Sequence, residues 1–294
     1  YLEVLLIDKG TYSKSSLRRR RIIIKGKKTA IIIVWVLVIL ALLVGALLTG
    51  SAEKHETIKE VMRDAVLHYS NQISFFGIIN VNPAFISAVV VSATLLVAAA
   101  IIRIFVIPKF KIIPGRFQLL LEQLVKFFMD FAEKNSPHRN RFLGAYIFGA
   151  GMYIFVGTIF ELFGFQAVTT KGHPVALPAP LSDINGAITM GCLSYLVVIS
   201  GGIAGNGPKG ILRALKDFSM PLSMSFRLFG ALLSGVLVTE LLYYYLQLSF
   251  GLPVVAGVLF TLLHALVQTY VLIMLTSSSY GEVSEPHKKV KSNA

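Results

Sequence analysis

Long apolar runs separated by short polar segments make up most of this chain. Each run reaches the roughly 20 residues that an α-helix needs to cross a bilayer. The first run, "AIIIVWVLVILALLVGALL", has no charge and exceeds the apolar core of a cleaved signal peptide, so we expect a retained helix. The pattern predicts an all-α integral membrane protein with about six spans, at residues 30–50, 84–107, 142–168, 184–204, 222–248 and 254–280.

Some of the polar segments carry a local pattern of their own. Residues 116–134 place apolar side chains at helical spacing and basic ones elsewhere, which predicts an amphipathic helix on the membrane surface. Residues 53–72 are predicted to form a soluble or interfacial helix, with His55 and His68 on its solvated face. The segment "GNGPKG" at 205–210 has the glycine spacing of a dinucleotide-binding loop, but it follows a membrane helix rather than a strand, so we expect a turn.

Composition and charge support the membrane interpretation and predict an orientation. Hydrophobic residues make up 55% of the chain and charged residues 15%, and the mean hydropathy is +0.71. Alternate polar segments hold 23 of the 28 Lys and Arg residues, so they are predicted to face the cytoplasm or its topological equivalent. These segments are 1–29, 103–141, 205–217 and 281–294. The asymmetry and anionic lipids explain the net charge of +13, so no nucleic acid partner is expected.

The same pattern predicts how the chain is organised. A membrane domain is expected over residues 84–285, preceded by an extra N-terminal span and followed by a short tail. The flanking regions are a basic cytoplasmic segment (1–29), the extra span (30–50), an outer amphipathic segment (51–83) and a cytoplasmic tail (286–294).

Ionisable side chains inside the predicted spans are the candidates for function. Arg227 lies between apolar residues, where an unpartnered cation is unfavourable by about 2.5–3.5 kcal/mol or more. An acid on another chain, a water-filled cavity, or snorkelling to the interface from a position near Pro221 could offset this. Glu240 lies thirteen residues further on, roughly 20 Å along a helix, so it cannot neutralise Arg227 directly.

The last two spans are predicted to be antiparallel neighbours, because only the short segment 249–253 joins them. His264 and Gln268 are four residues apart and share one face of the final span. Small side chains follow Arg227 at spacings that let another helix approach closely, which suits sliding contact with a moving partner. They are Gly230, Ala231, Ser234 and Gly235.

Three motifs carry a resemblance to a known family. "PLSMSFRLFGALLSG" and, about forty residues later, "HALVQTYVLIMLTSSSYGE" resemble subunit a of F-type ATP synthases, and so does "LPAPLSDINGAITMG" at 177–191. The similarity covers roughly residues 75–285 and leaves the extra N-terminal span unexplained. It implies a long tilted helix pair that faces a c-ring, and two aqueous half-channels that couple proton or sodium flow to rotation and ATP synthesis.

The resemblance also implies partners and residue roles. The expected partners are the c-ring, b-type peripheral stalk subunits, other F0/F1 subunits and the lipid membrane, with no cofactor, no metal and no nucleotide site in this chain. Arg227 would face the c-ring carboxylates, and Gln268 would orient its guanidinium. Our own hypothesis is that Glu240 stands near the entrance of the outer half-channel and His264 close to Arg227, as separate relay stations bridged by water. The outer vestibule would also include Glu161 and Asp183, and the inner path Thr276, Ser277, Ser278 and Glu282.

The chain departs from the family pattern at three positions. Ala231 replaces a common Asn, Val236 a common acid or His, and Thr261 a common His or acid. Because many mitochondrial members carry the His that Val236 replaces, a bacterial plasma membrane is favoured over a mitochondrial inner membrane.

Two other functions are consistent with a membrane arginine. A standalone secondary transporter would use Arg227 and Glu240 as substrate sites and would usually show a repeated half, which the sequence lacks. A structural membrane subunit would use its polar side chains only to hold helices together.

Overall fold

The structure is a computed structural model that describes residues 31–41, 44–45, 57, 59–60, 63, 72–75, 79–170, 172, 174–245 and 252–285. Its contacts divide the chain into two units, Tyr1–Lys54 with Leu242–Pro253, and His55–Leu241 with Val254–Ala294. In the first unit, Ile31–Ala41 forms a short apolar helix within the predicted first span, which is described only in part. The predicted segments 1–29 and 286–294, and nearly all of the predicted helix 53–72, lie outside the described residues.

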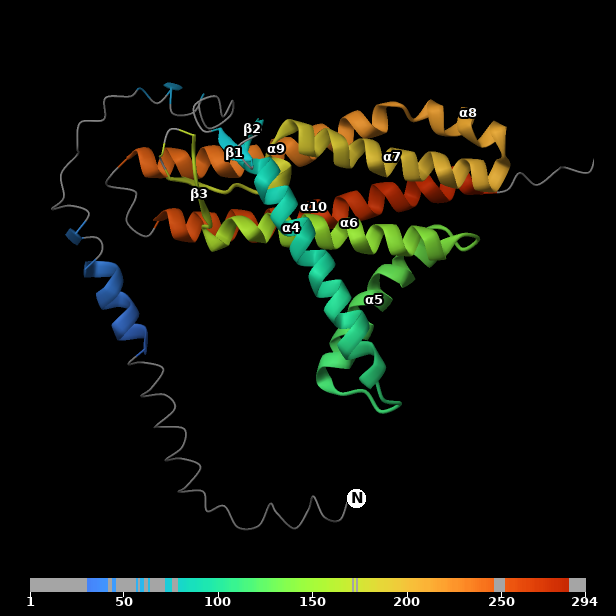
Figure 1. Ribbon diagram of the computed structural model, residues 1–294, viewed down its shortest axis with the longest axis horizontal. Helices are drawn as coiled ribbons and strands as arrows, with labels where there is room; N and C mark the ends of the chain where they lie inside the picture. Colours follow the sequence, from blue (N-terminus) through green and yellow to red (C-terminus); the bar gives the residue numbers. More distant parts are fainter. Residues whose placement is uncertain are drawn as a thin grey trace, which may run out of the picture. The chain divides into compact units, whose positions relative to one another are not determined.

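Five helices of the described chain are long and apolar enough to cross a membrane, which confirms five of the predicted spans (Figure 1). They are α4 (Pro83–Ile101), continued by the π-helix η1 (Ile102–Val106) and the 3₁₀ turn η2 (Ile107–Lys109); α6 (Asn140–Phe160), continued by η3 (Glu161–Phe163); α7 (Ile184–Asn206); α9 (Ser219–Tyr244); and α10 (Leu252–Ser284). At 33 residues, α10 is about 50 Å long, more than the roughly 30 Å apolar core of a bilayer, so it must tilt or extend beyond it.

Three local predictions were wrong or incomplete. The span expected over 142–168 ends early, because Gly164 adopts a left-handed conformation (φ 61°) after η3. The turn expected at 205–210 is confined to Gly207 (φ 62°), and Pro208 then begins the unexpected helix α8 (Pro208–Lys216). Two antiparallel hairpins were not expected: β1 (Ile73–Phe75) pairs with β2 (Ile79–Val81), and β3 (Gln166–Val168) pairs with β4 (Pro174–Ala176).

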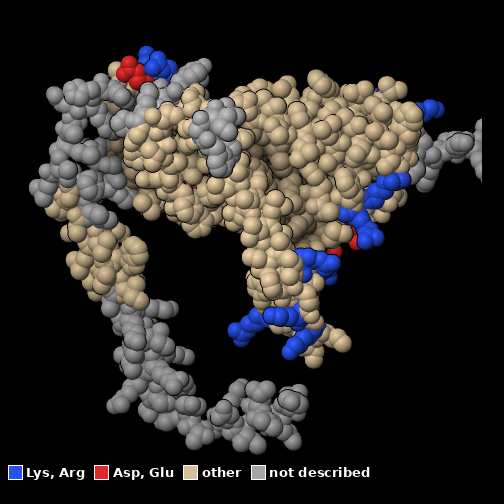
Figure 2. Space-filling model, in the orientation of Figure 1, with Lys and Arg blue, Asp and Glu red and all other residues tan. Residues whose placement is uncertain are grey.

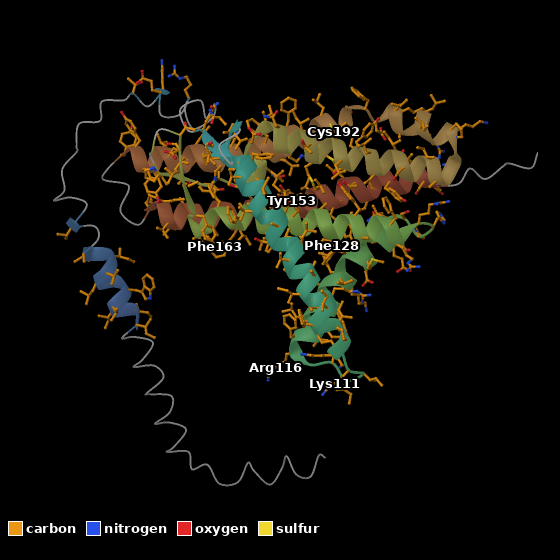
Figure 3. The ribbon with its side chains drawn as sticks, in the orientation of Figure 1. Lys111, Arg116, Phe128, Tyr153, Phe163 and Cys192 are labelled. Atoms are coloured by element: carbon orange, nitrogen blue, oxygen red, sulfur yellow. The ribbon has the colours of Figure 1, made fainter. Side chains whose placement is uncertain are left out.

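The predicted amphipathic helix is confirmed as α5 (Arg116–Asn135), but only part of its apolar stripe faces protein. Phe128 and Ala132 are buried against α6 and α10, whereas Leu119, Leu120 and Phe127 are exposed. The C-terminal part of α4 and the first half of α5 project together away from the other helices (Figure 1). Lys111 and Arg116 lie at the tip of this projection (Figure 3).

The N-termini of α4 and α7 are joined by side-chain hydrogen bonds at one end of the helices. Asn82 caps α4 by accepting from the Ala84 N–H, and its Nδ2 donates to Asp183 Oδ1 at 2.9 Å. Asp183 in turn caps α7 by accepting from the Asn185 N–H. The two hairpins meet at the same end, where the Thr170 N–H donates to the Gln72 carbonyl.

The ends of α5, α7 and α10 meet at what we call the basic end, formed by residues 134–141, 206–216 and 281–285. Asn206 Nδ2 donates to the carbonyls of Val283 and Glu285, and Arg213 donates to that of Glu285. These bonds satisfy carbonyls that the end of α10 would otherwise leave unpaired. Segments 103–141, 205–217 and 281–294, predicted to share one side of the membrane, therefore contact one another where they are described.

Glycines allow the helices to cross closely at the basic end. A Cβ on Gly205 of α7 would overlap the backbone of Ser284 on α10, whereas one on Gly149 of α6 would meet nothing within 4 Å. We therefore expect Gly205→Ala to destabilise the protein by about 1–3 kcal/mol, because backbone cannot move aside as a side chain can. Unfolding of the purified full chain in detergent measures this, with Gly149→Ala as the matched control. Equal stability of the two variants would contradict the close crossing.

Candidate functional site

Arg227 lies in the first third of α9, a helix of 26 residues whose other charged residue, Glu240, is thirteen positions away. One face of α9 packs against α6, α7 and α10 through Leu228 and Leu232. Arg227, directly before Leu228, lies on the exposed face of α9 that adjoins this packed face. Since α9 is apolar enough to span a membrane, Arg227 is a permanent cation within the apolar layer. Its charge must be stabilised there by a partner group or by water.

A stripe of small side chains continues along the exposed face of α9. We call Ser223, Arg227, Gly230 and Ser234 the outward stripe; all four are exposed and they follow helical spacing. A Cβ on Gly230 would meet no atom within 4 Å. Ser223 was not among the residues identified from sequence, although its position four residues before Arg227 could have indicated it. The stripe leaves room for another helix to come close to Arg227.

Gln268 lies beside Arg227, and this juxtaposition was predicted. Both side chains line one small cleft of about 10 Å³ between α9 and α10, which is near the lower limit for holding one water molecule. Gln268 is 5% exposed, and its Oε1 has no hydrogen-bond partner among the described residues. A buried acceptor without a partner is unfavourable by about 1–3 kcal/mol, and the neighbouring guanidinium carries five donors. The cleft therefore favours a hydrogen bond between Arg227 and Gln268.

His264 lies one turn before Gln268 and faces α9. A Cβ on Gly235 would be 3.5 Å from His264 Nδ1, so the imidazole occupies the space that this glycine leaves. Its ring centroid is 6.1 Å from that of Phe260, and no hydrogen bond holds it to another described residue. The pairs Gly235–His264 and Arg227–Gln268 confirm that α9 and α10 run antiparallel.

Glu240 is half-buried on α9, five residues beyond Gly235. Along the helix axis it therefore lies about 7.5 Å past His264 and about 20 Å past Arg227. His264 is about 12 Å from Arg227 when counted along α9 from Gly235, and about 6 Å when counted along α10 from Gln268, so it lies between the two charged groups. The order along the helix pair is therefore Glu240, His264 and Arg227, and the roles of Glu240 and His264 as relay stations stay a prediction.

The candidate residues of the last turns of α10 differ in exposure. Thr276 and Ser277 are fully buried, and Ser277 Oγ donates to the carbonyl of Ile273, whereas Thr276 Oγ1 has no partner among the described residues. Ser278 and Glu282 are exposed. Only the latter two are open to solvent or to a partner without movement of the helix.

Glu161 and Asp183 both lie at the end opposite the basic end, and each is engaged by the fold. The Ala179 N–H is directed at the Glu161 carboxylate, and Asp183 makes the two capping bonds described above. Asp183 also lines a cavity of about 690 Å³ with mainly apolar walls from α4, α6 and α7. Asn82, its partner, was missed from the sequence, although an Asn directly before Pro83 is a typical helix start.

Comparison with known proteins identifies a family. Residues 86–280 match the family model described as ATP synthase A chain. The match extends from α4 into the last turns of α10, and it includes all the candidate residues except Glu282.

Proposed function

This chain belongs to the ATP synthase A chain family, and from that premise we propose that it couples ion flow to rotation through Arg227. In this proposal two aqueous half-channels meet α9 and α10, and a ring of c subunits turns against the outward stripe. A b-type peripheral stalk would hold the chain stationary. The membership itself makes the chain a multi-pass membrane subunit of an ATP synthase, in agreement with its five apolar helices.

One observation carries the proposal: a permanent cation on the exposed face of an apolar helix, within a stripe of small residues. A structural arginine would be expected in a buried ion pair or at a helix end. Arg227 instead faces outwards, with Gln268 behind it. A carboxylate on a passing helix is the partner that such a cation would favour.

The proposed mechanism follows from the charge of the guanidinium. A protonated carboxyl of the ring that arrives beside Arg227 would ionise, because the cation favours the charged form, and its proton would leave by one half-channel. After the ring moves on, the carboxylate would take up a proton from the other half-channel. Arg227 would block direct passage between the two, since a fixed cation repels a proton or sodium ion. The mechanism is tested by measuring ATP-driven acidification in liposomes that hold the assembled complex, because acidification requires proton flow to be coupled to ring rotation.

Gln268 would position the guanidinium rather than take part in proton transfer. Its amide does not titrate, and its buried Oε1 can accept from Arg227 across the cleft. This would hold the guanidinium between the stripe and the helix pair.

Glu240 and His264 would relay protons from the outer side towards the ring. The imidazole is not hydrogen-bonded to any described residue, so its nitrogens remain available to water. The spacing of about 7.5 Å along the axis between Glu240 and His264 fits a connection through water rather than direct contact. Glu161 and Asp183 would line the outer vestibule, and Thr276, Ser277, Ser278 and Glu282 the inner path.

We expect Glu240→Gln to slow ATP-driven acidification several-fold, because an amide keeps the shape of the side chain but cannot exchange a proton. The measurement uses the assembled complex in liposomes, with ATP hydrolysis and assembly checked on the same sample. Glu282→Gln, on the exposed end of α10, makes the same chemical change on the proposed inner path. It should affect proton transfer between the ring and the inner side, not proton transfer through the outer half-channel. Unchanged acidification in Glu240→Gln would remove Glu240 from the path.

We further propose a bacterial plasma membrane as the location, on the strength of Val236. The choice between proton and sodium would depend on the carboxyl of the c subunits. Acidification that persists without sodium would identify the proton.

A further inference from the structure

A cavity of about 430 Å³ opens at the basic end, away from the cleft of Arg227. The loop between α5 and α6 and the first turn of α6 form one wall. Ser200 and Ala204 of α7 and Tyr280 of α10 form the others. The cavity therefore joins three segments that are far apart in the sequence. We call it the basic-end cavity.

Positive charge gathers on the lining of this cavity. Arg139 and Arg141 both line it, and neither forms an ion pair with any residue that the structure describes. His138, beside them, can add a further donor. Figure 2 shows clusters of Lys and Arg in blue at this end of the molecule, with few acidic residues among them. Both arginines are exposed, and two guanidinium groups on one cavity wall suit an anionic ligand.

The backbone at the start of α6 also favours an anion in the cavity. The helix α6 begins at Asn140, which lines the cavity, and no side chain caps its first turn. The first N–H groups of a helix have no partner within it, and the helix dipole makes this end positive. An anion in the cavity would find these N–H groups beside the two guanidinium groups.

Tyr280 gives an independent indication of a ligand. Its side chain is only 2% exposed, held against α7 where a Cβ on Gly201 would overlap its ring. Its hydroxyl makes no hydrogen bond to any described residue, although it is near enough to Arg139 to interact electrostatically. The ring is buried, but the hydroxyl oxygen is accessible from the cavity. Here it lines the cavity as an unused donor.

We propose that the basic-end cavity binds the phosphate of an anionic phospholipid. The membrane-spanning helix α6 starts at the cavity, so the phosphate would lie at the level of the headgroups. Phe142, which also lines the cavity, is 56% exposed and offers an apolar surface to an acyl chain. A free phosphate would share the polar contacts but would leave Phe142 uncovered. The inference depends on the chain lying in a membrane and is independent of the role proposed for Arg227.

Such a lipid would connect α6, α7 and the last turns of α10. Tyr280 lies between Ser278 and Glu282 in the chain, so an occupied cavity would steady the segment assigned to the inner path. The bound phosphate would also neutralise charge that otherwise repels itself at the basic end. We therefore expect the lipid to stabilise the fold as well as to bind.

The test measures lipid binding to the full chain in an uncharged detergent by native mass spectrometry, alongside the thermal unfolding midpoint. The probes are dioctanoyl phosphatidylglycerol, dioctanoyl phosphatidylcholine and inorganic phosphate. The variants are Arg139→Gln with Arg141→Gln, and Tyr280→Phe. Arg116→Gln with Lys126→Gln is the matched control, because it removes two exposed charges of α5 that do not line the cavity.

We expect phosphatidylglycerol to bind more tightly than phosphatidylcholine and to raise the unfolding midpoint. The double arginine variant should lose about 25-fold in affinity, and Tyr280→Phe about fivefold, while the control stays within about twofold. An equal loss in the control would mean general charge attraction and would overturn the site. Equal stabilisation by inorganic phosphate would overturn the lipid assignment. Should the double variant not fold, unchanged affinity in Tyr280→Phe would overturn the proposal.

Discussion

Replacing Arg227 by alanine should reduce ATP-driven acidification to background in an assembled complex. The exposed guanidinium is the charge that would favour ionisation of each arriving ring carboxyl, and alanine offers neither charge nor hydrogen bond. Passive proton leak under an imposed potential should rise at the same time, because the cation between the two half-channels is gone. Arg227→Lys should restore little, since an ammonium lacks the planar fork and can lose its proton when buried.

The matched control for Arg227 is Arg103→Ala. Arg103 is also exposed and lies in a membrane-spanning helix, but it belongs to η1, near the end of the α4 span. Its removal should leave acidification and leak near wild type. Both variants are compared at equal assembly, measured as the yield of intact complex. Normal pumping by Arg227→Ala would reject the proposed mechanism and leave the arginine a packing or snorkelling residue.

A tryptophan at Gly230 should stop rotation without unfolding this chain. A Cβ at Gly230 would meet nothing within 4 Å, so a large side chain can extend outwards from α9. It would then occupy the space beside Arg227 through which the proposed ring passes. We expect ATP-driven acidification to fall more than about tenfold, since overpacking by a whole indole cannot be absorbed at a close helix contact.

Leu222→Trp provides the comparison for this variant. Leu222 is 58% exposed on α9, but it lies off the outward stripe. An indole there should face lipid and leave acidification within about twofold of wild type. The thermal unfolding midpoint of each variant chain distinguishes blocked rotation from misfolding. If both tryptophans reduce acidification equally, the stripe has no special role and the ring must contact another face.

The outward stripe also illustrates how far the pattern of residues could lead. The spacing of small residues after Arg227 predicted a close helix contact. The structure leaves Gly230 and Ser234 open, whereas Gly235 packs against His264 of α10. For α5 the same reasoning gave the helix but not its packing. Leu119, Leu120 and Phe127 have the right spacing for a buried face, yet the helix turns Phe128 and Ala132 towards α6. In a membrane protein both faces of a helix can be apolar. Hydrophobic periodicity therefore does not distinguish a face that packs against protein from a face that contacts lipid.

The short elements were the hardest to predict. Strands of three residues and the helix α8 are too brief to give a reliable period. The hairpins depend on neighbours, since Ile73 is buried only because Val91, Phe160 and Leu177 surround it. Gly207 was assigned to a turn correctly, but the helix that follows Pro208 is held by contacts with α7 that no local pattern contains.

The sequence by itself determined five of the membrane helices, the antiparallel order of α9 and α10, and the family motifs around Arg227 and Gln268. Length, apolar content and helical spacing are properties of neighbouring residues, so they can be read along the chain. Only the tertiary structure decided that Arg227 faces outwards while Gln268 is buried beside it, and that Arg139 and Tyr280 share a cavity. Those arrangements depend on how helices rotate and cross, which is set by packing among residues distant in the sequence.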